Sequence, residues 1–433
     1  MRKLGEDNSN FVREKLDPLL TWPDKDSSNP KGFYEDKPPF DRTVEWFGKV
    51  MGFDKYQTPY TFTDSWDKVE IMATFLVPKD LQPGDNCPIM WYFHGGGFVT
   101  DTRKCTGAGD HVPWYSKASL EHAKRHKAIV IAPDYPLGPE AHYKTIADSV
   151  RDFLRFYKED GCFEAGEDHW TQWLAKAIDK EDVTINREKV FIEGESAGAH
   201  AAVTAMFLNA DKGDGAKLNI NAALLRYPMI AHYERSFPSR SKTLSYMGHN
   251  VFEADAIHQA SAIVAEIEVL QKLGLVPTRA RGYAPEYMAP AFLLSTTGFW
   301  KYLFQRRHQC SSGLPSDERD YMDCLERAEK CSTTVESRHL PPIVMYHGHD
   351  DLNCPYHNTE KFKQLLMKYY PEQYVENETV FLEPVTFLNE KAGLEGNYSP
   401  EVGHGFDYAL RGDREPFLKR AYERVDRFWP ECK

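Results

Sequence analysis

The segment from Val190 to Ala205 is compatible with few local structures. It begins as an apolar run, continues as Gly194-Glu195-Ser196-Ala197-Gly198 and ends in a stretch rich in alanine, which favours a helix. A strand that turns directly into a helix leaves no space for side chains beside the turn, so glycines are required on both sides of the serine. The pattern therefore predicts a strand–turn–helix unit that holds Ser196 in a strained conformation with its hydroxyl exposed.

Short apolar runs recur along the chain, separated by stretches long enough for a helix. They lie at residues 69–77, 88–93, 128–132, 189–192, 222–227, 342–346 and 379–382. Strands that are apolar on both faces and alternate with helices are typical of a mostly parallel sheet covered on both sides. We therefore predict an α/β fold with such a sheet at its centre.

One long segment, residues 230–338, interrupts this rhythm because it contains no convincing strand. An insertion above the carboxyl ends of parallel strands lies where ligands bind, so we expect this segment to form a cap. Residues 1–60, in which residues 11–20 have helical spacing, are expected to join it. The catalytic domain then consists of residues 61–229 and 339–433. A separate helical domain at the insertion is the alternative.

The expected cap contains two distinctive stretches. Residues 259–273 have the spacing of an amphipathic helix, and residues 283–304 are rich in aromatic side chains. The aromatic side chains could line an acyl or aryl pocket, or they could simply belong to the core. Both interpretations stay open.

A second glycine-rich motif, His94-Gly95-Gly96-Gly97, follows the apolar run at 88–93. Consecutive glycines let the backbone approach a reacting carbonyl and donate N–H groups to an oxyanion. The motif lacks the spacing of a dinucleotide-binding fingerprint, and no P-loop lysine follows it. Taken alone it equally fits a flexible turn, but it precedes the serine motif in the chain order that an acyl-transfer site needs.

A serine hydroxyl needs a general base, and the base needs an acid that orients it. In hydrolases with this strand–turn–helix unit the chain order is serine, acid and then histidine. His404 stands between two glycines after the last predicted strand, and Asp350 and Asp351 follow the run at 342–346. Neighbouring loop residues point in different directions, so the residues alone leave both aspartates open.

Together these motifs resemble the hormone-sensitive-lipase-like carboxylesterases, also called the HGGG family. The resemblance extends over residues 88–407 and includes Asp134-Tyr135-Pro136-Leu137-Gly138-Pro139-Glu140, in which Pro136 and Gly138 replace the usual Arg and Ala. It implies the α/β-hydrolase fold with a largely helical cap. It also favours Asp351 as the acid, because the family's block matches from His347 to Pro355.

The resemblance further implies the roles of individual residues. Ser196 would be the nucleophile and His404 the base, and the oxyanion would bind to the N–H groups of Gly96, Gly97 and Ala197. The residues that would support these motifs are His94, Gly95, Gly194, Glu195 and Gly198. The cap is longer than is usual in the family, which weakens any transfer of substrate preference.

The expected reaction is the hydrolysis of a carboxylic ester through an acyl-enzyme, with a small to medium apolar or aromatic ester as substrate. It requires neither a metal nor an organic cofactor. The same residues could serve an amidase, a lactone or thioester hydrolase, or an acyltransferase. A non-catalytic ligand receptor on the same fold is the alternative from another class.

Composition narrows the range of partners. The formal net charge of −12 disfavours nucleic acid, which would need a basic face. No apolar run approaches the length of a membrane span, and no secretory leader is visible, so we expect a cytoplasmic location. The oligomeric state is open.

Histidines and cysteines outside these motifs are the remaining candidates for metal binding. His347, His349 and His357 lack zinc-type spacing and fall in the acid loop. His122 and His126 are four apart on an expected helix without the intervening glutamate of zinc proteases, and we interpret them as a solvated helix face. The eight cysteines form no Cys-x-x-Cys pair, so we expect mostly buried thiols and leave disulfides open.

Overall fold

The structure is a computed structural model of the 433-residue chain. It describes residues 11–12, 14–16, 19, 51–63, 66–100, 115–158, 169–180, 182–213, 217–231, 243–246, 249–280, 291, 293–295, 297–305, 323–389, 402–408 and 410–429. Residues 11–12, 14–16 and 19 are helical, within the segment expected to form a helix.

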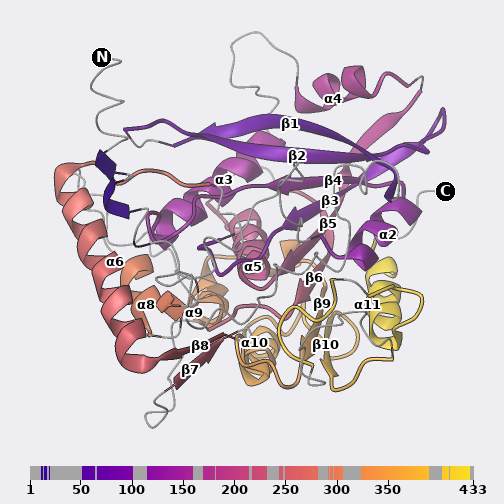
Figure 1. Cartoon of the computed structure of the whole chain (residues 1–433). Coiled ribbons are helices and arrows are strands. Elements are labelled where there is room, and N and C mark those ends of the chain that lie inside the picture. The colour runs from indigo at the N-terminus through magenta and orange to yellow at the C-terminus, as the bar shows by residue number, and fades with distance from the viewer. Residues whose placement is uncertain are drawn as a thin grey trace.

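An eight-stranded sheet runs through the centre of the molecule in the order β1-β2-β4-β3-β5-β6-β9-β10 (Figure 1). The strand β2 pairs antiparallel with β1 on one side and with β4 on the other, and all the other pairs are parallel. The strands are β1 (Phe53–Phe62), β2 (Glu70–Pro78), β3 (Asn86–Phe93), β4 (Ile129–Pro133), β5 (Thr184–Glu195), β6 (Ile220–Arg226), β9 (Ile343–Gly348) and β10 (Val380–Val385). Each of the seven predicted apolar runs overlaps one of these strands, and the predicted fold class is confirmed.

Both faces of the sheet are buried, as the apolar runs require. In β3, the side chains of Ile89 and Trp91 enter one core cluster, and those of Met90 and Tyr92 enter the other. One face is covered by α3 (Tyr143–Lys158), α4 (Trp170–Ile178), α5 (Ala197–Ala210) and α10 (Tyr356–Tyr369). The other face is covered by α2 (Lys117–Arg125) and α11 (Pro416–Asp426).

Two expectations about chain organisation were wrong. The strand β1 was not predicted, and the expected boundary at residue 60 falls inside it, so residues 53–60 belong to the sheet rather than to a cap. The segment 230–338 was expected to contain no strand, but β7 (Thr243–Tyr246) and β8 (His249–Phe252) pair antiparallel in it as a small separate sheet.

The same segment contains α6 (Glu253–Leu273), which extends the predicted helix at its N-terminal end. Its buried side chains follow the spacing of one helix face: Ala256, Ala260, Ile263, Val264, Ile267 and Leu270. The helices α8 (Phe299–Gln305) and α9 (Cys324–Lys330) follow, and α9 packs against α5 and α10. Two short 3₁₀ turns, Cys331–Thr333 and Ser337–His339, lead into β9. Figure 1 shows α6 along the outer edge of the molecule.

Two further expectations concern thiols and membranes. Cys324 and Cys331 carry buried free thiols, and Cys87 and Cys354 are buried as well, while the other four cysteines lie outside the described residues. Within the part of the chain that the structure describes, no helix combines the length and apolar character that crossing a membrane requires.

Candidate active site

Ser196 lies at the sharp turn between β5 and α5, as its motif predicts. Its backbone has φ 50° and ψ −118°, a conformation that L-residues rarely adopt. The flanking glycines are required by contact: a Cβ atom at Gly194 would lie 2.4 Å from the carbonyl oxygen of Gly198, and one at Gly198 would lie 2.0 Å from that of Phe93. The sequence Gly-x-Ser-x-Gly therefore allows β3, β5 and α5 to approach closely enough to present the serine hydroxyl.

Ser196, His404 and Asp351 form a chain of hydrogen bonds across three segments that are distant in sequence. The distance from His404 Nε2 to Ser196 Oγ is 2.9 Å, and that from His404 Nδ1 to Asp351 Oδ2 is 2.7 Å. Asp350, the other aspartate left open by the sequence, is exposed and pairs with His349. The structure thus brings Asp351, and not Asp350, to the histidine.

The loop that carries Asp351 is fixed by the backbone around it. Asp351 Oδ1 accepts hydrogen bonds from the N–H groups of Asn353 and Cys354, both at 2.8 Å. A Cβ atom at Gly348 would lie 2.2 Å from the carbonyl oxygen of Val402, so this glycine lets the acid loop touch the loop of His404. Burial by itself would raise the pKa of Asp351, but the neighbouring His404 and His347 outweigh it and hold that pKa well below its usual value.

His347 is a third partner of the acid that the sequence did not single out for this role. Its Nε2 lies 3.1 Å from Asp351 Oδ2 and 2.6 Å from the carbonyl oxygen of Cys354, and both acceptors require a proton at this nitrogen. Its Nδ1 then accepts from the Thr359 hydroxyl at 2.9 Å. The family's sequence block, which matches from His347 to Pro355, includes this histidine. The match locates the acid but does not indicate what the histidine contacts.

The glycine-rich loop after β3 lies against the serine. Gly96 and Gly97 have φ values of 89° and 62°, which favour glycine, and a Cβ atom at Gly95 would lie 3.5 Å from Ser196 Cβ. His94 stacks on Tyr135 with ring centroids 4.2 Å apart. Ala197 is the first residue of α5, where backbone N–H groups have no partner within the helix.

Two side chains from the segment expected to be the cap bind the outer, carbonyl side of this loop. Arg279 donates to the carbonyl oxygens of Val99 at 2.7 Å and of Gly138, and its guanidinium pairs with Glu140 at 2.8 and 2.9 Å. Trp300 Nε1 donates to the carbonyl oxygen of Gly97 at 3.1 Å. With its carbonyl groups held from outside, the loop is restrained in the orientation that faces the serine.

The same segment explains one departure from the family's sequence block. A Cβ atom at Gly138 would lie 2.5 Å from the ring of Phe304, so the alanine usual at this position would collide with the ring. Phe304 in turn stacks on Trp300 with centroids 4.3 Å apart. Both of these aromatic side chains are buried core rather than exposed surface, while Tyr283 and Tyr287 of the same stretch lie outside the described residues.

A buried cluster of charges lies directly behind the serine and the histidine. The guanidinium of Arg226, at the end of β6, contacts Glu193 and Glu195, each at 3.1 Å, and Asp407 at 2.8 and 3.0 Å. All four side chains are fully buried. The carbonyl oxygen of Arg226 also accepts the N–H of Ser196 at 3.0 Å. Glu195 directly precedes Ser196, and Asp407 follows His404 by three residues. Arg226 therefore binds both the turn of Ser196 and the loop of His404.

Three carboxylates around one guanidinium do not all stay charged without cost. Burial raises the pKa of Glu193 to about 7, despite the opposing charge of Arg226. Burial also raises the pKa of Glu195. Part of the Glu193 carboxyl population is therefore protonated near neutral pH. Buried charged side chains produce no periodic pattern in a sequence. Of these four residues, the sequence motifs single out Glu195 alone, as part of Gly-x-Ser-x-Gly.

The interpretation of His122 and His126 as a solvated helix face was wrong. Both residues are buried, 2% exposed each, and both side chains face Asp426 of α11. The helix α2 that carries them is covered by α11, a contact between segments about three hundred residues apart that no local pattern predicts.

Comparisons with known proteins agree with this architecture. Residues 90–305 match the profile of a family described by the alpha/beta hydrolase fold. The chain is 24% identical over 304 residues to a probable carboxylesterase, M8, of Phoma sp., which covers 67% of this chain and 78% of the relative. It is 24% identical to arylacetamide deacetylase of Bos taurus over 48% of this chain and 45% of that protein, so it spans less than half of that second relative.

A solved structure, that of esterase LipW from Mycobacterium marinum, resembles the chain in outline. It is 18% identical, covers 89% of this chain and 85% of its own, and gives a TM-score of 0.45.

Proposed function

Because this chain belongs to the α/β-hydrolase superfamily as a relative of hormone-sensitive-lipase-like carboxylesterases, we propose that it hydrolyses carboxylic esters with Ser196, His404 and Asp351 as its catalytic triad. The observation that carries the proposal is the hydrogen-bonded chain from Asp351 through His404 to the strained Ser196. Nucleophile, base and orienting acid are the three groups that acyl transfer to a serine requires.

In the proposed first step, Ser196 Oγ attacks the ester carbonyl carbon while His404 Nε2 takes the hydroxyl proton. The carbonyl oxygen becomes an oxyanion, and the intermediate collapses when His404 gives the proton to the departing alkoxide. This leaves an acyl-serine and a free alcohol. Water then attacks the acyl group, His404 again takes and returns a proton, and the acid and the free serine result.

The charge that develops in these steps is distributed between two parts of the site. Asp351 holds the proton of His404 at Nδ1 and stabilises the imidazolium; its depressed pKa keeps it ionised. The N–H groups of Gly96, Gly97 and Ala197 are the proposed donors to the oxyanion. Each such donor contributes about 3 kcal/mol to transition-state stabilisation.

For the substrate we propose a small to medium ester with an apolar or aromatic acyl or alcohol group. Two features support this choice. Trp300 and Phe304, although buried, place two aromatic rings against Gly97 and Gly138, beside the glycine-rich loop that we propose binds the oxyanion. The formal net charge of −12 disfavours the approach of anionic substrates.

The direct test is the Ser196→Ala variant. It removes the attacking oxygen, so hydrolysis of short-chain nitrophenyl esters should fall to background and a fluorophosphonate probe should no longer label the chain. Ser332→Ala is the matched control, because among the described residues that hydroxyl donates to the carbonyl oxygen of Glu329 and has no contact with the site. Undiminished turnover or labelling in Ser196→Ala would overturn the proposal, as would ester binding without turnover by the unaltered chain.

A second activity, hydrolysis of an aryl amide, is favoured by one relative, whose name states that it deacetylates arylacetamides. The same serine, base and donors serve either bond, and the difference lies in the leaving group that His404 must protonate. Comparing kcat/KM for an aryl ester and the matching aryl amide decides between them. Faster turnover of the amide, with retention of its dependence on Ser196, would replace the ester by the amide as the proposed substrate.

A further inference from the structure

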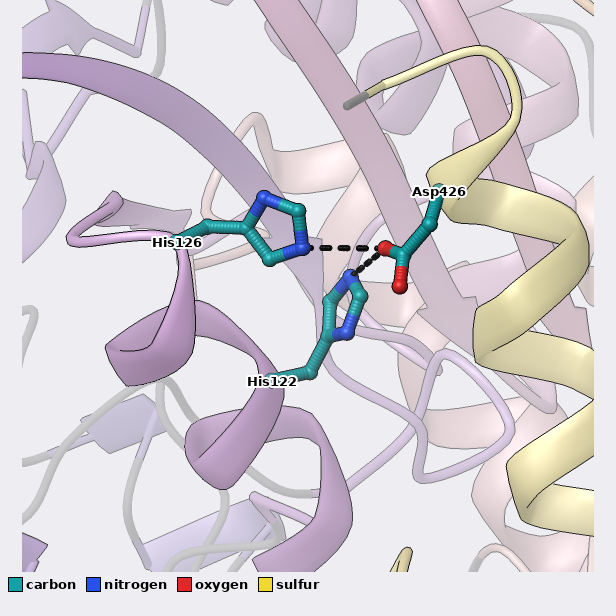
Figure 2. Close-up of side chains that lie close together, drawn as sticks. All are labelled: His122, His126 and Asp426. Atoms are coloured by element: carbon teal, nitrogen blue, oxygen red, sulfur yellow. Dashed lines mark hydrogen bonds and ion pairs between the residues drawn. The ribbon is translucent and has the colours of Figure 1, made fainter. Parts of the chain in front are cut away.

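His122, His126 and Asp426 bring three potential metal ligands together on the face of the sheet opposite α5. Figure 2 shows both imidazole rings pointing at the same carboxylate oxygen. His126 Nε2 lies 2.9 Å from Asp426 Oδ1, and His122 Nε2 lies 3.5 Å from it. Each of the three residues offers one atom that could ligate a metal ion, and these three atoms lie within 4.8 Å of one another.

From this convergence we propose that the chain binds one Zn²⁺ ion through His122 Nε2, His126 Nε2 and Asp426 Oδ1. Two imidazole nitrogens and one carboxylate oxygen are a ligand set that zinc commonly takes, with water in the fourth position. A tetrahedral ion with bonds of about 2.05 Å separates its ligands by about 3.3 Å. The two distances to Asp426, 2.9 and 3.5 Å, lie on either side of that value, and all three ligand atoms lie within 4.8 Å of one another, so side-chain rotations would close the site on the ion.

The polar atoms of the two rings support a ligand rather than a simple structural contact. His122 Nε2 is buried and forms no hydrogen bond with any described residue, although it faces the carboxylate. The rings are already fixed: His122 stacks on Tyr422 with centroids 4.4 Å apart, and His126 stacks on Trp429 at 4.5 Å. Binding would therefore order little that is not ordered already.

Solvent reaches the cluster past the carboxylate. The side chain of Asp426 is 31% exposed, whereas those of His122 and His126 are 1% and 0% exposed. An ion arriving from this side meets the carboxylate first and the two nitrogens behind it, and a bound water would occupy the exposed position.

Arg125 holds the cluster when no ion is bound. Its guanidinium donates to His122 Nδ1 and to Asp426 Oδ2, both at 2.8 Å, which places the proton of His122 on Nε2. Zinc needs the lone pair of that nitrogen, so binding moves the proton to Nδ1 and displaces the guanidinium. The side chain of Arg125 is 50% exposed and can withdraw into solvent. Arginine and zinc therefore compete for one site.

The ion would join α2 to α11, close to the C-terminal end of the described chain. Its expected effect is structural. Within the described residues, none of the three ligands forms a hydrogen bond or ion pair with Ser196, His404 or Asp351. Zinc binds the folded arrangement and not the unfolded chain, so it should raise the unfolding temperature while leaving esterase kinetics unchanged.

The test is a titration of the tag-free, chelator-treated chain with zinc chloride by calorimetry, repeated with Co²⁺, whose visible absorption reports a tetrahedral N and O ligand set. We expect one ion per chain and a rise of a few degrees in the unfolding temperature. Asp426→Asn and His126→Gln should weaken zinc binding by more than about tenfold. His258→Ala, which removes an exposed histidine, should bind as the unaltered chain does.

Arg125→Gln gives the sharper result, because it removes the competing cation and supplies an amide oxygen that can accept a hydrogen bond from the Nδ1–H of His122. It should bind zinc more tightly than the unaltered chain, and its esterase activity should be unchanged. Unfolding in the presence of chelator shows for each variant whether the apo-protein is intact. Absence of zinc binding by the unaltered chain and by Arg125→Gln, or equal binding after the loss of Asp426 or His126, would overturn the proposal.

Discussion

His347 and His404 donate to the same oxygen of the acid loop, Asp351 Oδ2, at 3.1 and 2.7 Å. The other oxygen of that carboxylate accepts two backbone N–H groups. Both carboxylate oxygens are therefore hydrogen-bonded. His347 and the N–H groups of Asn353 and Cys354 fix the orientation of the carboxylate toward His404. This relationship assigns His347 a positioning role in the proposed mechanism.

We predict that His347→Phe lowers kcat by about tenfold with little change in KM. The loss corresponds to one hydrogen bond to a charged group, about 1.5–3 kcal/mol, of which part remains because the backbone donors stay. His347→Gln keeps an N–H donor and should recover most of the rate. Steady-state kinetics of both variants checks this. A change confined to KM, or no rescue by glutamine, would contradict the positioning role.

Replacing the acid should separate the two neighbouring aspartates. Asp351→Asn removes the charge that stabilises the imidazolium and offers the wrong tautomer to His404, so kcat should fall by about 10⁴-fold. Asp350→Asn is the matched control: the side chain of Asp350 is 46% exposed and, within the described part of the chain, pairs with His349, so the kinetics should be unchanged. Equal losses in both variants would show that the loop, rather than the acid, had been damaged.

The contact between Arg279 and the glycine-rich loop after β3, the proposed oxyanion loop, predicts an effect on rate from a residue that need not touch substrate. Arg279→Ala frees the carbonyl groups of Val99 and Gly138 and leaves Glu140 without this partner. A small displacement of the loop should lower kcat by about ten- to a hundredfold.

Two variants control this prediction. Arg338→Ala removes an arginine that is 79% exposed and should change nothing. Adding Glu140→Gln to Arg279→Ala should restore stability but not rate, because the buried charge is removed while the loop remains unrestrained. Full restoration of rate in the double variant would show that the carboxylate, and not the loop, carries the effect.

The buried carboxylate Glu193 predicts a pH dependence of stability. Its pKa is raised from 4.5 to about 7, so the folded chain holds a proton that the unfolded chain releases. The free energy of unfolding should therefore fall as the pH rises from 4.5 to about 7, by up to about 3 kcal/mol from this group. Asp351, whose pKa is lowered, acts in the opposite direction only in more acidic solution.

Urea unfolding at intervals across that pH range provides the measurement. Glu193→Gln should flatten the slope, because an amide carries no titrating proton and can still accept from Ser119 and Arg226. Glu372→Gln, at an exposed position, should keep the slope of the unaltered chain. A slope that survives unchanged in Glu193→Gln would assign it to another group of the cluster.

Much of the fold could be predicted because most strands are buried on both faces and therefore read as continuous apolar runs. The strand β1 escaped because it is an edge strand: most of Phe53–Phe62 is only partly buried, and it contains Lys55, Gln57 and Pro59. The hairpin of β7 and β8 is too short, at four residues a strand, to stand out from a loop.

The three residues of the candidate site could be predicted from their order along the chain. Ser196 and Asp351 each follow a recognisable strand, and His404 stands between two glycines. The residues around this site could not be found this way. Arg226 looks like the end of an ordinary strand, and its three carboxylate partners come from positions 193, 195 and 407. His122 and His126 look polar and exposed because their burial depends on Tyr422 and Trp429, which only the folded chain brings near.

The bonds from Arg279 and Trp300 to the oxyanion loop have a consequence for engineering. A cap is the natural part to exchange when a new substrate is wanted, since the reacting groups belong to other segments. In this chain, exchange of residues 230–338, the expected cap, would also remove two restraints on the backbone that we propose binds the oxyanion. A chimaera that kept the body of this chain and borrowed another cap would need an arginine and a tryptophan at equivalent positions to retain its rate.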